Sequence, residues 1–155
     1  MTPGNPKSTA HIATHPIHPM LIPFPIAFLV GTLLSDIIFS QTGDAFWATA
    51  SLYLLGAGIV MALVAALAGF ADFFGDRRVR ALSHAWQHMI GNLVAVLLSI
   101  FNLWIRLGDP EGAVLSLGLP ISALVVLILL FTGWRGGDLV YRHRVGIPDE
   151  GSGAV

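Results

Sequence analysis

Four long stretches of this chain are almost free of charged residues, and each is long enough to cross a membrane as a helix. They cover residues 20–39, 45–71, 81–105 (or 84–105, if the helix begins at the histidine) and 113–134. A helix needs about 20 apolar residues to span the hydrocarbon core of a bilayer. Lipid offers no partner to a free backbone N–H or C=O group, so open sheets are excluded and the four stretches are expected to be α-helices.

The composition supports lipid as the solvent of these stretches. Hydrophobic residues make up 55% of the chain and charged residues 11%, whereas a soluble domain carries about 25% charged residues. The turns over residues 40–44 and 108–112 are short, which makes successive helices antiparallel neighbours. The predicted fold is therefore all-α, an integral membrane antiparallel four-helix bundle over residues 15–147, with flexible tails over residues 1–14 and 148–155.

The first stretch is expected to be a retained span and not a cleaved signal, because Lys7 lies far from it and no small-residue cleavage site follows. With four spans, both termini and the second loop lie on one side of the membrane. That side holds seven of the eight basic residues, and only Arg106 lies on the other. Basic flanks are retained in the cytoplasm, so the protein is predicted to lie in the cell (inner) membrane with both termini cytoplasmic.

The charge balance and the absence of cysteine exclude several functions. A net charge of −1 with few basic residues argues against nucleic-acid binding. The absence of cysteine excludes disulfides, iron–sulfur ligation and covalent haem attachment within this chain.

Histidines gather on the predicted cytoplasmic side. His15 and His18 precede the first span, and His84 and His88 open the third. At about 100° per residue, the third span presents one small and polar stripe, which is the kind of face that packs on neighbouring helices. The stripe consists of His84, His88, Gly91, Asn92, Ala95, Ser99, Asn102 and Arg106.

These histidines allow three interpretations. His18 and His88 could be the axial ligands of a haem b, with His84 and His15 as further candidates. Alternatively, His84 and His88, four residues apart on one helix, could bind a divalent metal together with His18 and Asp72. The third interpretation is structural, with imidazoles at the level of the lipid headgroups. Under either of the first two, Asp72 and Asp138 are candidates to orient an imidazole through its second N–H group.

Asp36 and Arg106 are predicted to form an ion pair on the opposite side. Asp36 lies near the outer end of the first span, and Arg106 closes the polar stripe of the third. Ionisable groups at such depth usually have a partner. The pair is expected to fix the register of the helices and not to carry chemistry.

Several motifs resemble a known family. They are His15-Pro16-Ile17-His18-Pro19-Met20, Phe24-Pro25-Ile26, Leu67-Ala68-Gly69-Phe70-Ala71-Asp72, His84-Ala85-Trp86-Gln87-His88, Gly133-Trp134-Arg135-Gly136-Gly137 and Tyr141-Arg142-His143-Arg144-Val145-Gly146. In this order, from about His15 to Ile147, the chain resembles the uncharacterised bacterial membrane family DUF2231. The resemblance implies four spans. Some members of that family are attached to Rieske or c-type cytochrome domains, which implies redox work.

Two functions from different classes follow. The first is a multi-pass haem- or metal-binding electron-transfer component with redox proteins as partners. The second is a non-catalytic scaffold or accessory subunit of a larger membrane complex, with small-residue faces that continue into partner helices or into a homo-oligomer. No catalytic residue is identified, so enzymatic activity stays open. No internal repeat is evident, which disfavours a transporter.

Overall fold

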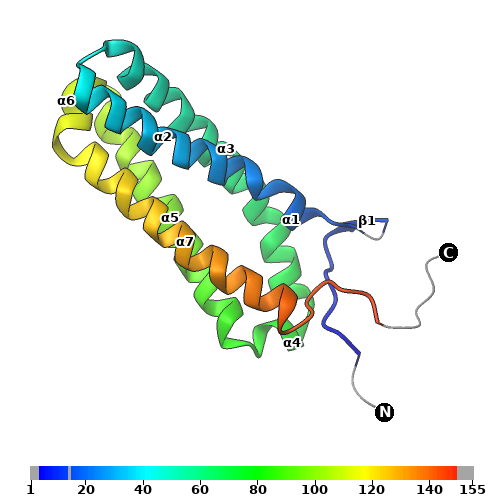
Figure 1. Cartoon of the computed structure of the whole chain (residues 1–155). Coiled ribbons are helices and arrows are strands. Elements are labelled where there is room, and N and C mark those ends of the chain that lie inside the picture. The colour runs from blue at the N-terminus through cyan, green and yellow to red at the C-terminus, as the bar shows by residue number, and fades with distance from the viewer. Residues whose placement is uncertain (1–3, 14, 150–155) are drawn as a thin grey trace.

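The computed structural model describes residues 4–13 and 15–149, and its main body is a bundle of long antiparallel helices (Figure 1). Within the described residues, four helical segments are long and apolar enough to cross a membrane: Ile17–Thr42, Ala45–Gly75, Ser83–Arg106 and Pro110–Tyr141. The predicted all-α four-span fold is confirmed. Positions 1–3 and 150–155, which belong to the expected tails, lie outside the described residues.

The first and fourth spans are each built from more than one helical element. The elements are β1 (His11–Ile12), β2 (His15–Pro16), α1 (Ile17–Leu21), α2 (Pro23–Thr42), α3 (Ala45–Gly75), α4 (Arg77–Arg80), α5 (Ser83–Arg106), α6 (Pro110–Ala113), the π-helical turn η1 (Val114–Gly118) and α7 (Leu119–Tyr141). β1 and β2 form a small antiparallel ladder before the first span.

The helix ends follow from local sequence. Pro23 occupies the first turn of α2, where its missing N–H costs nothing, so a new helix begins directly after Ile22. Gly43 ends α2 with a φ of 68°, a left-handed conformation that glycine adopts without strain. Asp44 then caps α3, because its carboxylate accepts a hydrogen bond from the backbone N–H of Phe46 at 3.0 Å.

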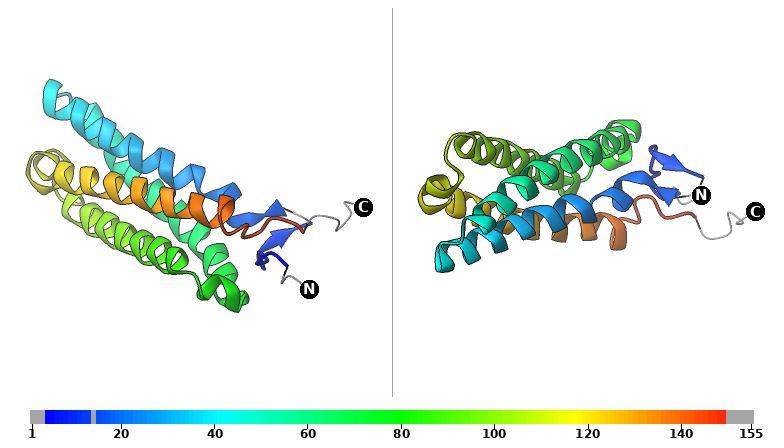
Figure 2. Two further views of the ribbon diagram at one scale, coloured as in Figure 1. Left: turned by 60° about the horizontal axis from the view of Figure 1, so that its bottom comes forward. Right: turned by 90° about the horizontal axis from the view of Figure 1, so that it is seen from above.

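Two helical hairpins make up the bundle, α2 with α3 and α5 with α7 (Figures 1 and 2). The described segments before α1 and after α7 lie with α4 at one end, here called the histidine end, and α6 lies at the other, here called the arginine end. Between 17% and 28% of the residues in the most apolar window of each span are buried. The exposed remainder is mostly large and apolar, with Leu67, Leu97 and Leu127 all more than half exposed. Such a surface requires lipid around it.

The two hairpins repeat one pattern of buried positions. Each of four buried residues in α2 is followed 70 positions later by a buried residue of α5. A constant spacing of 67 positions relates buried residues of α3 to buried residues of η1 and α7. The pairs are Pro25/Ala95, Leu29/Ser99, Thr32/Asn102, Asp36/Arg106, Ser51/Gly118, Leu55/Ser122, Gly58/Val125 and Ala65/Thr132.

The sequence shows no evident internal repeat, whereas the buried positions of the two hairpins follow one. Both hairpins start at the histidine end, so the matching helices of the two hairpins run in the same direction. The residue types differ at most paired positions, which conceals the repeat in the sequence. The repeat is parallel, and it brings equivalent positions of α2 and α5 to the same depth.

Candidate functional site: two buried polar centres

Asp36 and Arg106 form a doubly hydrogen-bonded ion pair near the arginine end. Arg106 Nη1 lies 2.8 Å from Asp36 Oδ1, and Nη2 lies 2.7 Å from Oδ2. Both side chains are 0% exposed. The two residues, which were expected to pair, occupy equivalent positions of the two hairpins. Parallel N–H···O bonds of this kind are the strongest arrangement of an arginine with a carboxylate.

Uncharged groups from α3, α5 and α7 complete this centre. Arg106 Nε donates to Asn102 Oδ1 at 2.9 Å, and the guanidinium also donates to Ser51 Oγ at 2.5 Å and Ser122 Oγ at 3.2 Å. Both serine hydroxyls donate in turn to the carboxylate of Asp36. All five guanidinium N–H groups therefore have an acceptor, which a buried charge requires.

Gly118 makes room for the guanidinium. A Cβ atom at this position would lie 3.0 Å from Arg106 Nη2 and 2.7 Å from the carbonyl oxygen of Ala113. The π-helical turn η1 ends at this glycine. A π-turn at a polar centre is a frequent feature of functional and strained sites; here it belongs to the packing around Arg106.

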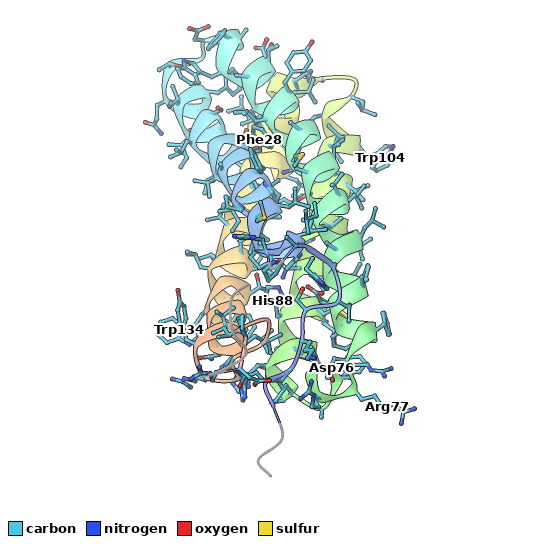
Figure 3. The ribbon with its side chains drawn as sticks, turned by 90° about the vertical axis from the view of Figure 1, so that its right-hand side faces the viewer. Phe28, Asp76, Arg77, His88, Trp104 and Trp134 are labelled. Atoms are coloured by element: carbon cyan, nitrogen blue, oxygen red, sulfur yellow. The ribbon has the colours of Figure 1, made fainter. Side chains whose placement is uncertain are left out.

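His18 and His88 face each other closer to the histidine end. His18 comes from α1 and His88 from α5, and their ring centroids lie 6.0 Å apart with an angle of 89° between the ring planes. Figure 3 shows His88 inside the bundle. His18 Nδ1 lies 2.8 Å from the carbonyl oxygen of Ala65, and His88 Nδ1 lies 2.8 Å from that of Thr132. Because a carbonyl only accepts, Nδ1 is the donor in each of these two contacts.

Each histidine ring lies against a glycine of the neighbouring helix. A Cβ atom at Gly69 would lie 3.0 Å from the His18 ring, and one at Gly136 would lie 3.0 Å from the His88 ring. Each glycine follows by four residues, or one helical turn, the residue whose carbonyl binds that histidine. Gly69 and Gly136 occupy equivalent positions of the two hairpins, 67 residues apart. Sequence reasoning missed both glycines as site residues, because their separation of 67 positions gains meaning only when the two hairpins are matched by their buried residues.

We expect Gly69→Ala and Gly136→Ala each to lower the free energy of unfolding in detergent by about 1–3 kcal/mol, because the added methyl group overpacks a ring held by its hydrogen bond. Gly56→Ala on α3 and Gly133→Ala on α7 are matched controls, since nothing lies within 4 Å of a Cβ atom there. At these open helical positions alanine should stabilise by about 0.5–1 kcal/mol. The measurement is the unfolding of each variant, followed by circular dichroism. Equal changes in the free energy of unfolding for Gly69→Ala, Gly136→Ala and the two controls would contradict the close contact between ring and glycine.

Asn92 braces His88. Its Nδ2 donates to the backbone carbonyl of His88 at 2.8 Å and lies 3.2 Å from His88 Nε2. Its Oδ1 accepts from Thr132 Oγ1 at 3.1 Å. The amide therefore ties α5 to the same residue of α7 that binds the imidazole.

The other predicted histidine ligands lie elsewhere. His84 Nδ1 lies 3.3 Å from His143 Nε2, and His84 Nε2 lies 3.7 Å from Asp138 Oδ2. Asp138 also pairs with Arg142 at 3.0 Å. His15 is exposed in β2. This histidine–carboxylate group sits at the histidine end, separate from the pair formed by His18 and His88.

Asp72 binds the N-terminal segment and no histidine. Its Oδ1 accepts from the backbone N–H groups of Thr9 and Ala10 and from Ser8 Oγ. The proposed metal set of His84, His88, His18 and Asp72 is therefore not brought together. Throughout residues 4–13 and 15–149, no three or more histidine, cysteine or acidic side chains are arranged to hold a metal ion.

Asp76 anchors the same N-terminal segment further out. Its Oδ2 accepts from the backbone N–H of Lys7 at 3.1 Å, and it forms a salt bridge with Arg78 at 2.7 Å. The hydrogen bonds from Arg78 hold the pKa of the Asp76 carboxyl well below its ordinary value. This contact therefore persists into the acid range.

The fold and its buried centres define a multi-pass membrane protein of four helical spans. The family model described as "Predicted membrane protein (DUF2231)" matches residues 14–149, so the chain belongs to the DUF2231 family. The resemblance seen in the sequence is thereby confirmed. No curated protein and no solved structure matches the chain.

Proposed function

We propose that this protein binds one haem b between His18 and His88 and acts as a membrane electron-transfer component. The observation that carries the proposal is the 6.0 Å between the two ring centroids. A metal–imidazole bond is about 2 Å long, so two imidazoles on opposite sides of one metal have centroids roughly 6 Å apart. The hydrogen bond from each Nδ1 to a carbonyl is the usual second contact of a metal-binding histidine, and it raises the basicity of Nε2.

Haem is favoured over a bare divalent ion by the number of ligands. Zinc and similar ions take three or four ligands from the protein, and the described residues offer two at this place. A porphyrin supplies the other four nitrogens and needs only two axial histidines. The surrounding helices are apolar, which suits the macrocycle. When bound, the haem would supply one-electron transfer. His18 and His88 would hold its iron, and Asn92 Nδ2, which lies 3.2 Å from His88 Nε2, would give up that contact.

The absorption spectrum of the purified protein, oxidised and reduced, tests this proposal. Protein from haem-replete cells, purified in mild detergent, should show a Soret band and a sharp α band on reduction, with about one haem per chain. Metal analysis of the same sample should give iron in equal amount. A colourless protein would overturn the proposal and leave the accessory-subunit function, which predicts stable co-purification with another membrane protein.

We also propose that the histidine end faces the cytoplasm of a cell membrane, because the basic residues concentrate there. The chain has no cysteine, so single cysteines can report the side. We expect Gly108→Cys to react with an impermeant maleimide in intact cells, and Arg77→Cys to react only after the membrane is opened. Both positions are exposed. Labelling of both from the same side would contradict this orientation.

A further inference from the structure

The segment before the first span, expected as a flexible tail, is held against the end of α3 by the carboxylates of Asp72 and Asp76 and by the carbonyl oxygen of Ala71. We call residues 4–13 the N-terminal strap. Asp72 Oδ1 accepts from Thr9 N at 2.7 Å, from Ala10 N at 2.8 Å and from Ser8 Oγ at 2.8 Å. Hydrogen bonds to a charged acceptor are about twice as strong as those between neutral groups. Asp72 is therefore the main attachment of the strap to the bundle.

The strap is in turn attached to the helix that carries His18. The backbone N–H of Ile17, the first residue of α1, donates to the carbonyl oxygen of Ala10 at 2.9 Å. α1 has five residues, none of them buried, and it is separated from α2 at Ile22. The imidazole of His18 is held by its hydrogen bond to Ala65 and its contact with Gly69, and the strap adds a hold on the start of α1 through Ile17. His88, in contrast, lies within the continuous 24-residue helix α5.

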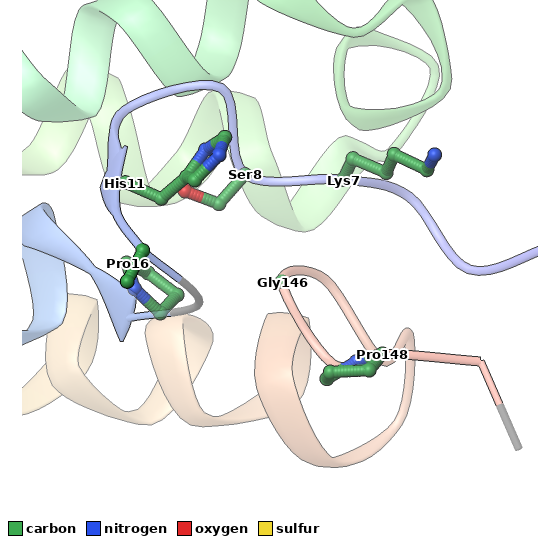
Figure 4. Close-up of a pocket in the computed structure, with 7 residues that line it drawn as sticks. Lys7, Ser8, His11, Pro16, Gly146 and Pro148 are labelled. Atoms are coloured by element: carbon green, nitrogen blue, oxygen red, sulfur yellow. The ribbon is translucent and has the colours of Figure 1, made fainter. Parts of the chain in front are cut away.

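Other contacts join the strap to the C-terminal segment. Gly146 N donates to the carbonyl oxygen of Pro6 at 2.9 Å, and Asn5 Nδ2 donates to that of Ile147 at 3.1 Å. Between the strap and the C-terminal segment lies a cavity of about 210 Å³ (Figure 4). The C-terminal segment therefore touches the strap at its start and leaves space beside its middle.

We infer that Asp72 is a positioning residue for His18, and that His18 is the ligand that detaches when Asp72 releases the strap. This inference rests on the proposed function. Asp72 follows Gly69, the seat of His18, by three residues, so both lie on one face of α3. The strap and the imidazole of His18 thus contact the same face of α3. Release would leave an iron held by His88 alone, with an open position for a diatomic ligand such as carbon monoxide.

The spectrum of Asp72→Ala, compared with Asp72→Asn, tests the inference. In Asp72→Ala we expect loss of the six-coordinate spectrum and binding of carbon monoxide to the reduced protein, which the parent protein should not bind. Asparagine keeps an oxygen that accepts the same N–H groups, so Asp72→Asn should restore the parent spectrum. Asp76→Ala is the matched control, because it removes the contact at Lys7 and the salt bridge with Arg78 but leaves the hydrogen bonds at Asp72 in place. If the parent protein contains haem and the Asp72→Ala variant has the same spectrum as the parent, the inference is overturned and the proposed function stands.

A measurement that does not depend on haem gives the second readout. Cysteine placed by Ala10→Cys should react with a maleimide about tenfold faster, or more, when combined with Asp72→Ala, because three hydrogen bonds to a carboxylate are lost. An unchanged rate would overturn the inference, even if the Asp72→Ala protein has lost its haem. If the parent protein contains no haem but the cysteine still reacts faster in the Asp72→Ala background, the proposed function is refuted and the attachment of the strap by Asp72 is retained.

Discussion

Arg106→Ala is expected to lower the free energy of unfolding in detergent by about 3–5 kcal/mol, the cost of removing one partner of a buried ion pair. The loss arises because the carboxylate of Asp36 stays buried without its counter-charge. Asp36 is 0% exposed, and without the guanidinium only two serine hydroxyls would donate to it. A buried carboxylate without a counter-charge must either stay charged at high cost or take up a proton.

Two comparisons separate the ion pair from general packing. The double variant Asp36→Leu with Arg106→Met should recover most of the loss, because an apolar pair of similar volume removes both charges together. Arg142→Ala removes a largely exposed guanidinium, while the buried Asp138 keeps its contacts with Arg135 and His84, and should change the free energy of unfolding by less than about 1 kcal/mol. An Arg106→Ala protein as stable as the parent would show that the network contributes little to the fold.

If the protein binds haem as we propose, His88→Ala and His18→Ala should each lose it, the first more completely. A missing axial ligand leaves iron with a single protein bond, and His88 also connects α5 to Thr132. The measurement is haem per chain by absorbance after purification, together with the thermal unfolding of each variant. His18→Ala should keep part of its haem as a five-coordinate form held by His88.

His84→Ala is the matched control for both variants. It lies one turn before His88 on the same helix, but its ring contacts His143 and not the facing pair. We expect its haem content to equal that of the parent protein. If His84→Ala lost haem while His88→Ala retained it, the assignment of ligands would be wrong.

Depth in the membrane could be predicted from the sequence because it depends only on position along an apolar run. A rise of 1.5 Å per residue places any residue along a span once the ends of the span are known. Asp36 and Arg106 could be expected to meet for this reason: each is the ionisable residue near one end of its span, and both ends lie on the same side. The observed network adds Ser51 and Ser122, which the sequence did not single out.

Which histidines face each other could not be predicted in this way. His84 and His88 share a stripe and a helix, and the sequence allowed either or both to join His18. The two histidines differ in the residues of α7 and of the turn after it that they contact. The carbonyl of Thr132 and the open side of Gly136 receive His88, whereas His84 meets the turn after α7, where His143 lies.

The amino-acid sequence by itself determined the four spans, their antiparallel order, the end that carries the basic residues and the family. These depend on the length, composition and order of apolar runs, which are properties of one segment at a time. Only the tertiary structure decided the repeat between the hairpins, the facing of His18 and His88, and the use of Asp72 to hold the strap. These depend on how each helix is rotated against its neighbours, and that rotation is set by the packing of side chains from all four spans at once.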